Sequence, residues 1–193
     1  MSPNRSPTER SLLDAAASLL ERGGPAAVTT RAVLDEAGVT APTLYHHFGD
    51  KDGLLDALLA EGVTRYFAHR AGLPESDDAL ADLVASWDLY LDFICEQPQL
   101  FSLLMSRAQA DPTLLERATA WCRGRLERLQ GEGRLAVDVD FGLQALLVSS
   151  NGVAMLRAQG GRDGDARDAG RFVFEQTLAG LVQSPGRAGP AAG

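Results

Sequence analysis

Apolar residues recur with helical spacing along the chain. Between Leu12 and Leu20, apolar side chains return every three or four residues, so they share one face of an amphipathic helix. The same spacing recurs in later segments. No stretch shows the sustained alternation of apolar and polar residues that half-buried strands require. The pattern therefore predicts an all-α protein.

Capping and breaking residues set the limits of the predicted helices. Ser6 followed by Pro7 and Glu9 is typical of a helix start, with a serine N-cap and a glutamate three residues later. The pair Gly23–Gly24 is expected to end that first helix. The predicted helices span residues 7–22, 30–37, 41–47, 51–70, 77–96, 99–109, 112–130, 139–159 and 165–183.

The turn-rich segment at residues 72–76 indicates a division into two domains. We expect a small N-terminal domain at residues 1–50, a connecting helix at 51–70 and a larger helical domain at 71–184. Residues 185–193 are rich in glycine, proline and alanine, and we expect this tail to be disordered.

Composition excludes several classes of protein. The 193 residues are 45% apolar and 23% charged, which is ordinary for a folded globular chain. Two cysteines, Cys95 and Cys122, are too few for a disulfide framework or a zinc site. No apolar run approaches the roughly 20 residues that span a bilayer, and the polar N-terminus does not resemble a signal peptide. We therefore expect a cytoplasmic protein with no membrane partner.

The net charge of −8 argues against a protein that coats nucleic acid non-specifically. The charge is uneven, however. Residues 1–70 hold seven basic and nine acidic residues, a net of −2, and they contain all three histidines and the only lysine, Lys51. The N-terminal domain can therefore still present a locally basic face.

The two short helices predicted at 30–37 and 41–47 have helix-turn-helix spacing. Gly38 permits a left-handed turn between them, and Val39 supplies an apolar residue to fill the angle. In this motif the second helix enters the major groove of DNA and its first residues reach base edges. The spacing alone is equally consistent with an ordinary helical hairpin whose outer face is solvated. The residues expected to face inward are Val33, Ala37, Val39, Leu44 and Phe48.

Residues 10–60 resemble the N-terminal domain of TetR-type transcriptional regulators. The similar elements, in order, are LLDAA, TTRAV, AGV, TLYHHF and KDGLL. They cover about a quarter of the chain, and beyond residue 60 only the general layout of the family is recognisable. The resemblance implies a three-helix DNA-binding domain, joined by a fourth helix to a helical ligand-binding and dimerisation domain.

The resemblance also implies roles for individual residues. Thr30 and Lys51 match phosphate contacts. Arg31 matches a position that reaches a base, where its forked guanidinium suits the O6 and N7 atoms of guanine. The complete expected DNA-binding set is Thr30, Arg31, Thr40, Ala41, Pro42, Thr43, Tyr45, His46 and Lys51. Leu34 departs from the alanine usual in the family, so packing of the second helix against the first is expected to be looser or shifted.

Histidine pairs in this region do not predict a metal site. The adjacent His46 and His47 cannot face one metal from a single helix, and His46 with Asp50 supplies only half a site. We expect no metal, and we place His47 against the fourth helix.

The resemblance implies that the larger domain binds a small molecule and forms a homodimer. Its aromatic residues and methionine suit an apolar pocket, although for any single one of them a core position is favoured. Few charges lie among them, so we expect a largely apolar effector. The predicted pocket residues are Trp87, Tyr90, Phe101, Met105 and Trp121.

Dimerisation is predicted through the helices at 139–159 and 165–183. The first is apolar almost all round and must be covered on more than one side. Pairing both helices with their symmetry mates gives a four-helix interface. Phe174 and Leu178 are the residues expected in it, and the alternative is a buried central helix in a monomer.

Taken together, these features predict a ligand-responsive regulator that binds a palindromic double-stranded DNA operator, with repression favoured over activation. The alternative from another class is a helical small-molecule-binding protein or an enzyme. No histidine follows His69, and no nucleophile–base or paired-carboxylate arrangement stands out. We therefore predict no catalytic residues, and no Gly-rich phosphate loop indicates a cofactor.

Overall fold

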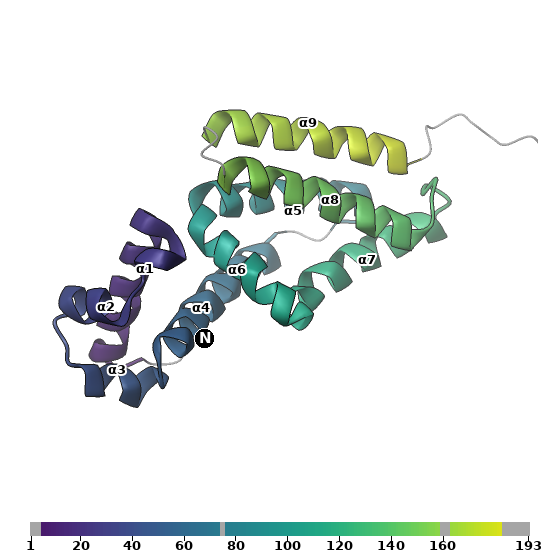
Figure 1. Ribbon diagram of the computed structural model, residues 1–193. Helices are drawn as coiled ribbons and strands as arrows, with labels where there is room; N and C mark the ends of the chain where they lie inside the picture. Colours follow the sequence, from purple (N-terminus) through teal and green to yellow (C-terminus); the bar gives the residue numbers. More distant parts are fainter. Residues whose placement is uncertain (1–4, 74–75, 159–162, 183–193) are drawn as a thin grey trace, which may run out of the picture. The chain divides into compact units, whose positions relative to one another are not determined.

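The computed structural model describes residues 5–73, 76–158 and 163–182, and these are helical almost throughout (Figure 1). The predicted all-α class is confirmed, since within these ranges the only β-type pairing is an isolated bridge between Leu135 and Val182. The predicted tail at 185–193 lies outside the described residues. The elements are α1 (Pro7–Ala27), α2 (Thr30–Ala37), α3 (Ala41–Phe48), α4 (Lys51–Ala71), α5 (Ala79–Glu96), α6 (Pro98–Ala110), η1 (Pro112–Leu115), α7 (Glu116–Gly131), α8 (Val139–Ala158) and α9 (Asp163–Leu181).

Local sequence accounts for the start of α1. The Ser6 hydroxyl accepts a hydrogen bond from the Glu9 amide at 3.2 Å, and the Glu9 carboxylate accepts one from the Ser6 amide at 2.7 Å. This reciprocal capping box is the predicted one, and it satisfies two amides that the helix itself leaves without partners.

The predicted end of α1 at Gly23–Gly24 is a kink instead. Gly24 has φ 67° and ψ −171°, which interrupts the helical backbone, but the helix resumes at Pro25 and runs to Ala27. A side chain on Gly24 would be strained by this positive φ, and its Cβ would lie 2.9 Å from Oε1 of Gln99 on α6. The glycine therefore bends the helix rather than ending it.

The chain divides into two compact units, one comprising Met1–Gly72 with Gln97–Gln109 and the other Leu73–Glu96 with Ala110–Gly193. This division differs from the predicted boundaries because α6 belongs to the first unit. Gly62 of α4 has no side chain, and a Cβ there would come within 2.3 Å of Leu100 on α6. In addition, Arg107 of α6 forms ion pairs of 3.0 Å with both Asp52 and Asp56 of α4.

The core of the first unit is built from the apolar faces of its helices. Its fully buried side chains include Leu12 of α1, Val33 of α2, Leu44 of α3 and Leu54 of α4. Of the five residues expected to face inward from the helix-turn-helix, Val33 and Leu44 are buried, whereas Ala37, Val39 and Phe48 are half-buried. Leu34 is also half-buried.

In the second unit, α5, α8 and α9 pack closely around a small residue. A Cβ on Gly170 of α9 would lie 2.7 Å from Val153 of α8 and 2.9 Å from Leu91 of α5. Ion pairs support the same packing, because Arg167 contacts Asp92 and Arg171 contacts Asp88, the latter at 2.6 Å. Figure 1 shows α8 and α9 running side by side.

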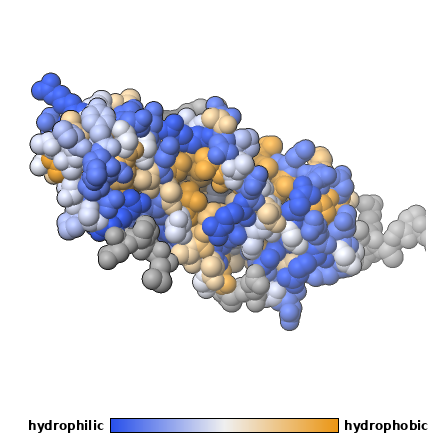
Figure 2. Space-filling model, turned by 90° about the horizontal axis from the view of Figure 1, so that it is seen from below, coloured by the Kyte–Doolittle hydropathy of each residue, from blue (hydrophilic) through white to orange (hydrophobic). Residues whose placement is uncertain are grey.

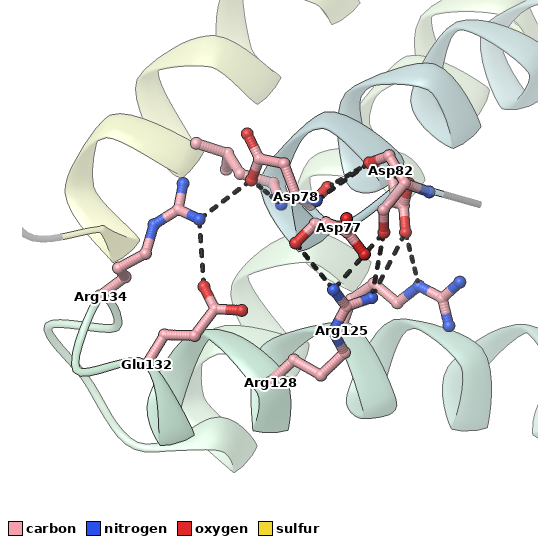
Figure 3. Close-up of polar contacts among 9 residues, drawn as sticks. Asp77, Asp78, Asp82, Arg125, Arg128, Glu132 and Arg134 are labelled. Carbon is pink, nitrogen blue, oxygen red and sulfur yellow. Dashed lines mark hydrogen bonds and ion pairs between the residues drawn. The ribbon is translucent and has the colours of Figure 1, made fainter. Parts of the chain in front are cut away.

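A buried carboxylate joins the start of α5 to α7 (Figure 3). The Asp82 side chain is only 4% exposed, and it accepts hydrogen bonds from the Ser76 amide at 3.0 Å and the Ser76 hydroxyl at 2.9 Å. Its second oxygen lies 3.3 Å from Nε of Arg125 and 3.8 Å from Nη1 of Arg128. Burial acts to raise the pKa of Asp82, but the Ser76 hydrogen bonds and Arg125 together outweigh it, so the pKa lies below its usual value.

By length and composition alone, α8 is the one helix in the described ranges that is apolar enough to cross a bilayer. Residues 139–157 have a mean hydropathy of 1.3, and 39% of the tested window is buried. Polar residues at 149–151 interrupt the apolar sequence of α8, but the mean hydropathy of the whole helix remains high. A core helix of a folded domain has the same character, and α8 packs against α7 and α9.

The surface seen in Figure 2 is mostly hydrophilic, with hydrophobic residues in patches between the polar ones. Patches of this kind are ordinary on folded proteins.

Candidate nucleic-acid interface

The turn between α2 and α3 has the geometry of a helix-turn-helix. The Thr29 hydroxyl caps α2 by accepting the Ala32 amide at 3.2 Å. Gly38 ends α2 in the left-handed conformation, with φ 66° and ψ 32°, which glycine adopts at little cost. The backbone is extended again at Thr40, and α3 starts at Ala41. Three residues, 38–40, therefore change the direction of the chain between two short helices.

The first turn of α3 presents small and polar groups. Thr40 and Pro42 are exposed, and Ala41 and Thr43 are half-buried. The Thr40 and Thr43 hydroxyls lie 3.1 Å apart and bond to each other, and no side chain caps the helix backbone. Threonine hydroxyls can donate to or accept from base edges, and an apolar methylene can contact a thymine methyl.

The outer face of α3 continues with Tyr45 and His46. Tyr45 is 52% exposed and His46 is also exposed, so neither is a core residue. A phenol and an imidazole on this face can donate hydrogen bonds to phosphate oxygens or base edges.

Three further candidates lie at the starts of α2 and α4. Thr30 is the half-buried first residue of α2, and Arg31 follows it with a side chain that is 91% exposed. Lys51 is the first residue of α4, directly after the N-cap Asp50, whose carboxylate accepts the Gly53 amide at 2.8 Å. Cationic and amide donors at a helix start are suited to a phosphate.

Arg107 of α6 affects the charge around Lys51, and the sequence pattern did not indicate this. It neutralises Asp52 and Asp56, the carboxylates that follow Lys51 on α4. No local pattern connects residues 55 positions apart, so only the folded chain reveals this pairing.

His47 is half-buried and contacts the first helix. Its Nδ1 atom is 3.7 Å from the Glu9 carboxylate of α1. The Ser6 backbone amide is the main cause that lowers the pKa of Glu9, and His47 adds to it. This contact joins α3 to the start of α1. Within the described ranges, no group of three His, Cys, Asp or Glu side chains is placed to hold a metal ion.

The five expected pocket residues are divided between the two units. Trp87 is 7% exposed and stacks on Phe174 with ring centres 4.2 Å apart, and Tyr90 lies 5.4 Å from Trp87. Trp121 belongs to the same unit and lies beneath the Arg125 guanidinium at 4.4 Å. The remaining two, Phe101 and Met105, are on α6 in the first unit.

The exposed apolar surface of the second unit lies on α8 and α9. Seven of the ten large apolar side chains that are exposed in the described ranges lie on these two helices. Phe174 and Leu178, expected at the interface, are instead buried within the protomer, because the inner side of α9 faces α5 and α8. The seven residues, called here the α8–α9 apolar surface, are Phe141, Leu147, Val148, Met155, Leu156, Phe172 and Val173.

The fold and the outward-facing residues of α2 and α3 define a helix-turn-helix protein with a separate helical unit. Residues 12–58 match the family model of bacterial regulatory proteins of the tetR family. The predicted resemblance to TetR-type transcriptional regulators is confirmed for this N-terminal segment, which is about a quarter of the chain.

Individual relatives agree with this assignment. The uncharacterized HTH-type transcriptional regulator YvkB of Bacillus subtilis is 32% identical over 88 residues, which cover 46% of this chain and 40% of that protein. The class D tetracycline repressor of Escherichia coli is 37% identical over 81 residues, covering 42% of this chain and 33% of the repressor. The chain thus matches less than half the length of these relatives. The solved structure of a TetR transcription regulator from Haloarcula marismortui has a TM-score of 0.76 at 19% identity, covering 91% of this chain and 98% of that one.

Proposed function

We propose that this protein is a transcriptional repressor that binds a palindromic operator as a homodimer and is released by a small, largely apolar molecule. The carrying observation is the exposed helix-turn-helix surface, on which Arg31, Tyr45 and His46 stand free of the core. Similarity of the N-terminal region to a tetracycline repressor supports repression over activation. Access to chromosomal DNA places the protein in the cytoplasm, and we propose no catalytic role.

The proposed contacts are of two kinds: contacts with phosphates that position the protein on DNA, and contacts with base edges that recognise the sequence. Thr30, Tyr45 and Lys51 contact phosphates and set the register, which carries no sequence information by itself. Arg31 and the first turn of α3 read base edges in the major groove. Because few cationic residues take part, we expect modest non-specific affinity and a shallow dependence on salt.

Replacing Lys51 with alanine is expected to weaken binding to all DNA sequences about equally and to reduce the slope of log affinity against log salt by roughly one unit. The operator is first selected from randomised duplexes, and affinities are then measured over a salt series. Arg65→Ala is the matched control, because it removes an exposed positive charge from the same helix, about 21 Å further along. Equal effects of the two substitutions would remove Lys51 from the interface.

We place the effector next to Trp87. Its indole Nε1 is buried with no hydrogen-bond partner among the described residues. A buried donor of this kind costs about 1–3 kcal/mol unless an acceptor is supplied, and an effector with a carbonyl or ether oxygen can supply one. The stacked Phe174 ring and nearby Tyr90 provide apolar walls.

Trp87→Phe preserves the apolar ring and removes the donor. In a panel of apolar carbonyl compounds screened by tryptophan emission, we expect binders to lose roughly tenfold in affinity for this variant, while operator binding without effector is unchanged. The same compounds should weaken operator binding by the factor by which DNA weakens theirs. Trp121→Phe is the control, and an equal loss in that variant would show that the effector does not contact the Trp87 donor.

A further inference from the structure

Arg31 has an acidic neighbour on its own helix. Its Nε atom lies 3.7 Å from Oδ2 of Asp35, four residues later, and both side chains are largely exposed. Within the part of the chain that the structure describes, Arg31 has no other hydrogen bond or ion pair. Its two terminal nitrogens are therefore available.

Helix stability does not account for this pair. Arg31 is the second residue of α2 and Asp35 is near its end, so each charge lies at the end of the helix where the backbone dipole disfavours it. A basic residue preceding an acidic one is also the weaker order for such a pair.

The adjacent carboxylate, Glu36, has a different role. It is held by two contacts with Arg22 of α1, at 2.5 and 3.3 Å, and thereby fastens α2 to α1. The Arg22 guanidinium, by hydrogen bonding and charge, lowers the pKa of Glu36. Asp35 makes no such contact with another helix in the described ranges.

We propose that Asp35 is a positioning residue for base recognition by Arg31, an inference that rests on the operator binding proposed above. Its carboxylate attracts the Nε side of the guanidinium and leaves both terminal nitrogens to face O6 and N7 of a guanine end-on. Its charge also repels phosphate oxygens, so Arg31 is disfavoured from settling on the DNA backbone. Asp35 thus favours contact of Arg31 with one base over contact of Arg31 with a phosphate.

The size of the effect follows from the geometry. A separation of 3.7 Å is longer than a hydrogen bond, so Asp35 biases the conformers of Arg31 without locking them. We expect a threefold to tenfold loss of base preference without it, a fraction of the roughly 5- to 150-fold that a bidentate arginine–guanine pair supplies.

The test compares base preference at each operator position among variants, using selection from randomised duplexes followed by competition binding. Arg31→Ala should flatten preference for guanine at one position in each half-site. Asp35→Asn, which keeps the side-chain shape, should reduce preference at that same position and strengthen binding to unrelated DNA about twofold. In the Arg31→Ala background, Asp35→Asn should leave the preference profile unchanged, whereas Asp35→Glu in the wild-type background should retain part of the preference.

Glu36→Gln is the matched control, since it removes a neighbouring negative charge from the same helix. We expect it to lower the melting temperature and to leave the preference profile intact. The proposal is overturned if Asp35→Asn strengthens binding to every sequence equally, with or without Arg31, because Asp35 then acts only as a bulk charge. A wild-type protein that enriches no sequence at all contradicts operator binding itself, and this inference with it.

Discussion

Replacing Val148 with glutamate is expected to split the proposed homodimer and to lower affinity for a two-half-site operator at least 100-fold. Val148 is 71% exposed in the middle of α8, within the α8–α9 apolar surface. In a four-helix interface its side chain would be buried against the partner, where an unpaired carboxylate carries a large desolvation penalty. A monomer then binds each half-site alone and loses the gain of about 10²–10⁴ that linked binding supplies.

Light scattering and operator titration measure the two effects separately. Val84→Glu is the matched control, because Val84 is 43% exposed on α5 and lies outside the α8–α9 apolar surface. It should remain dimeric and bind normally. Leu178→Glu is unsuitable for this purpose, since Leu178 is buried within the protomer and its replacement would unfold the unit. A Val148→Glu protein that stays dimeric would show that the interface lies elsewhere.

Replacing Asp82 with alanine is expected to destabilise the second unit by about 3–5 kcal/mol, which lowers the melting temperature by roughly 10–20 °C. The substitution removes the carboxylate that lies 3.3 Å from Nε of Arg125, whose side chain is largely buried, and breaking a buried ion pair is strongly destabilising. It also removes the acceptor of both Ser76 hydrogen bonds, which hold the start of α5. Thermal unfolding followed by circular dichroism measures the loss.

Asp140→Ala is the control, because Asp140 forms a short ion pair of 2.6 Å with Arg123 but is exposed. Exposed pairs contribute about 0–1 kcal/mol, so this variant should melt within a few degrees of the wild type. Equal losses in the two variants would show that burial of Asp82 adds nothing to its ion pairs.

The same carboxylate gives a pH dependence with a definite sign. Because the pKa of Asp82 is lower in the folded than in the unfolded state, its contribution to stability is complete above the unfolded value of about 3.9. That contribution is lost as the pH falls below this value and through the folded pKa. The wild type should therefore lose more stability than Asp82→Ala between about pH 5 and pH 2.

Sequence alone determined the features that depend on neighbouring residues. The capping box at Ser6, the left-handed turn at Gly38 and the cap at Asp50 are each formed by residues within a few positions of one another, so their identity decides the local structure. The helix-turn-helix and the exposure of Tyr45 and His46 follow from the spacing of apolar residues on two short helices. The family resemblance rests on this same segment.

Tertiary structure decided which helices meet and which of their faces are buried. Adjacent apolar residues at 172–174 point to different sides of α9, so periodicity could not tell that Phe174 stacks on Trp87 while Phe172 and Val173 remain outside. Likewise, no sequence pattern predicted that Leu100 would pack against Gly62 or that α6 would belong to the first unit. The physical reason is common to both: burial depends on contacts between distant segments, and those contacts exist only once the helices have packed.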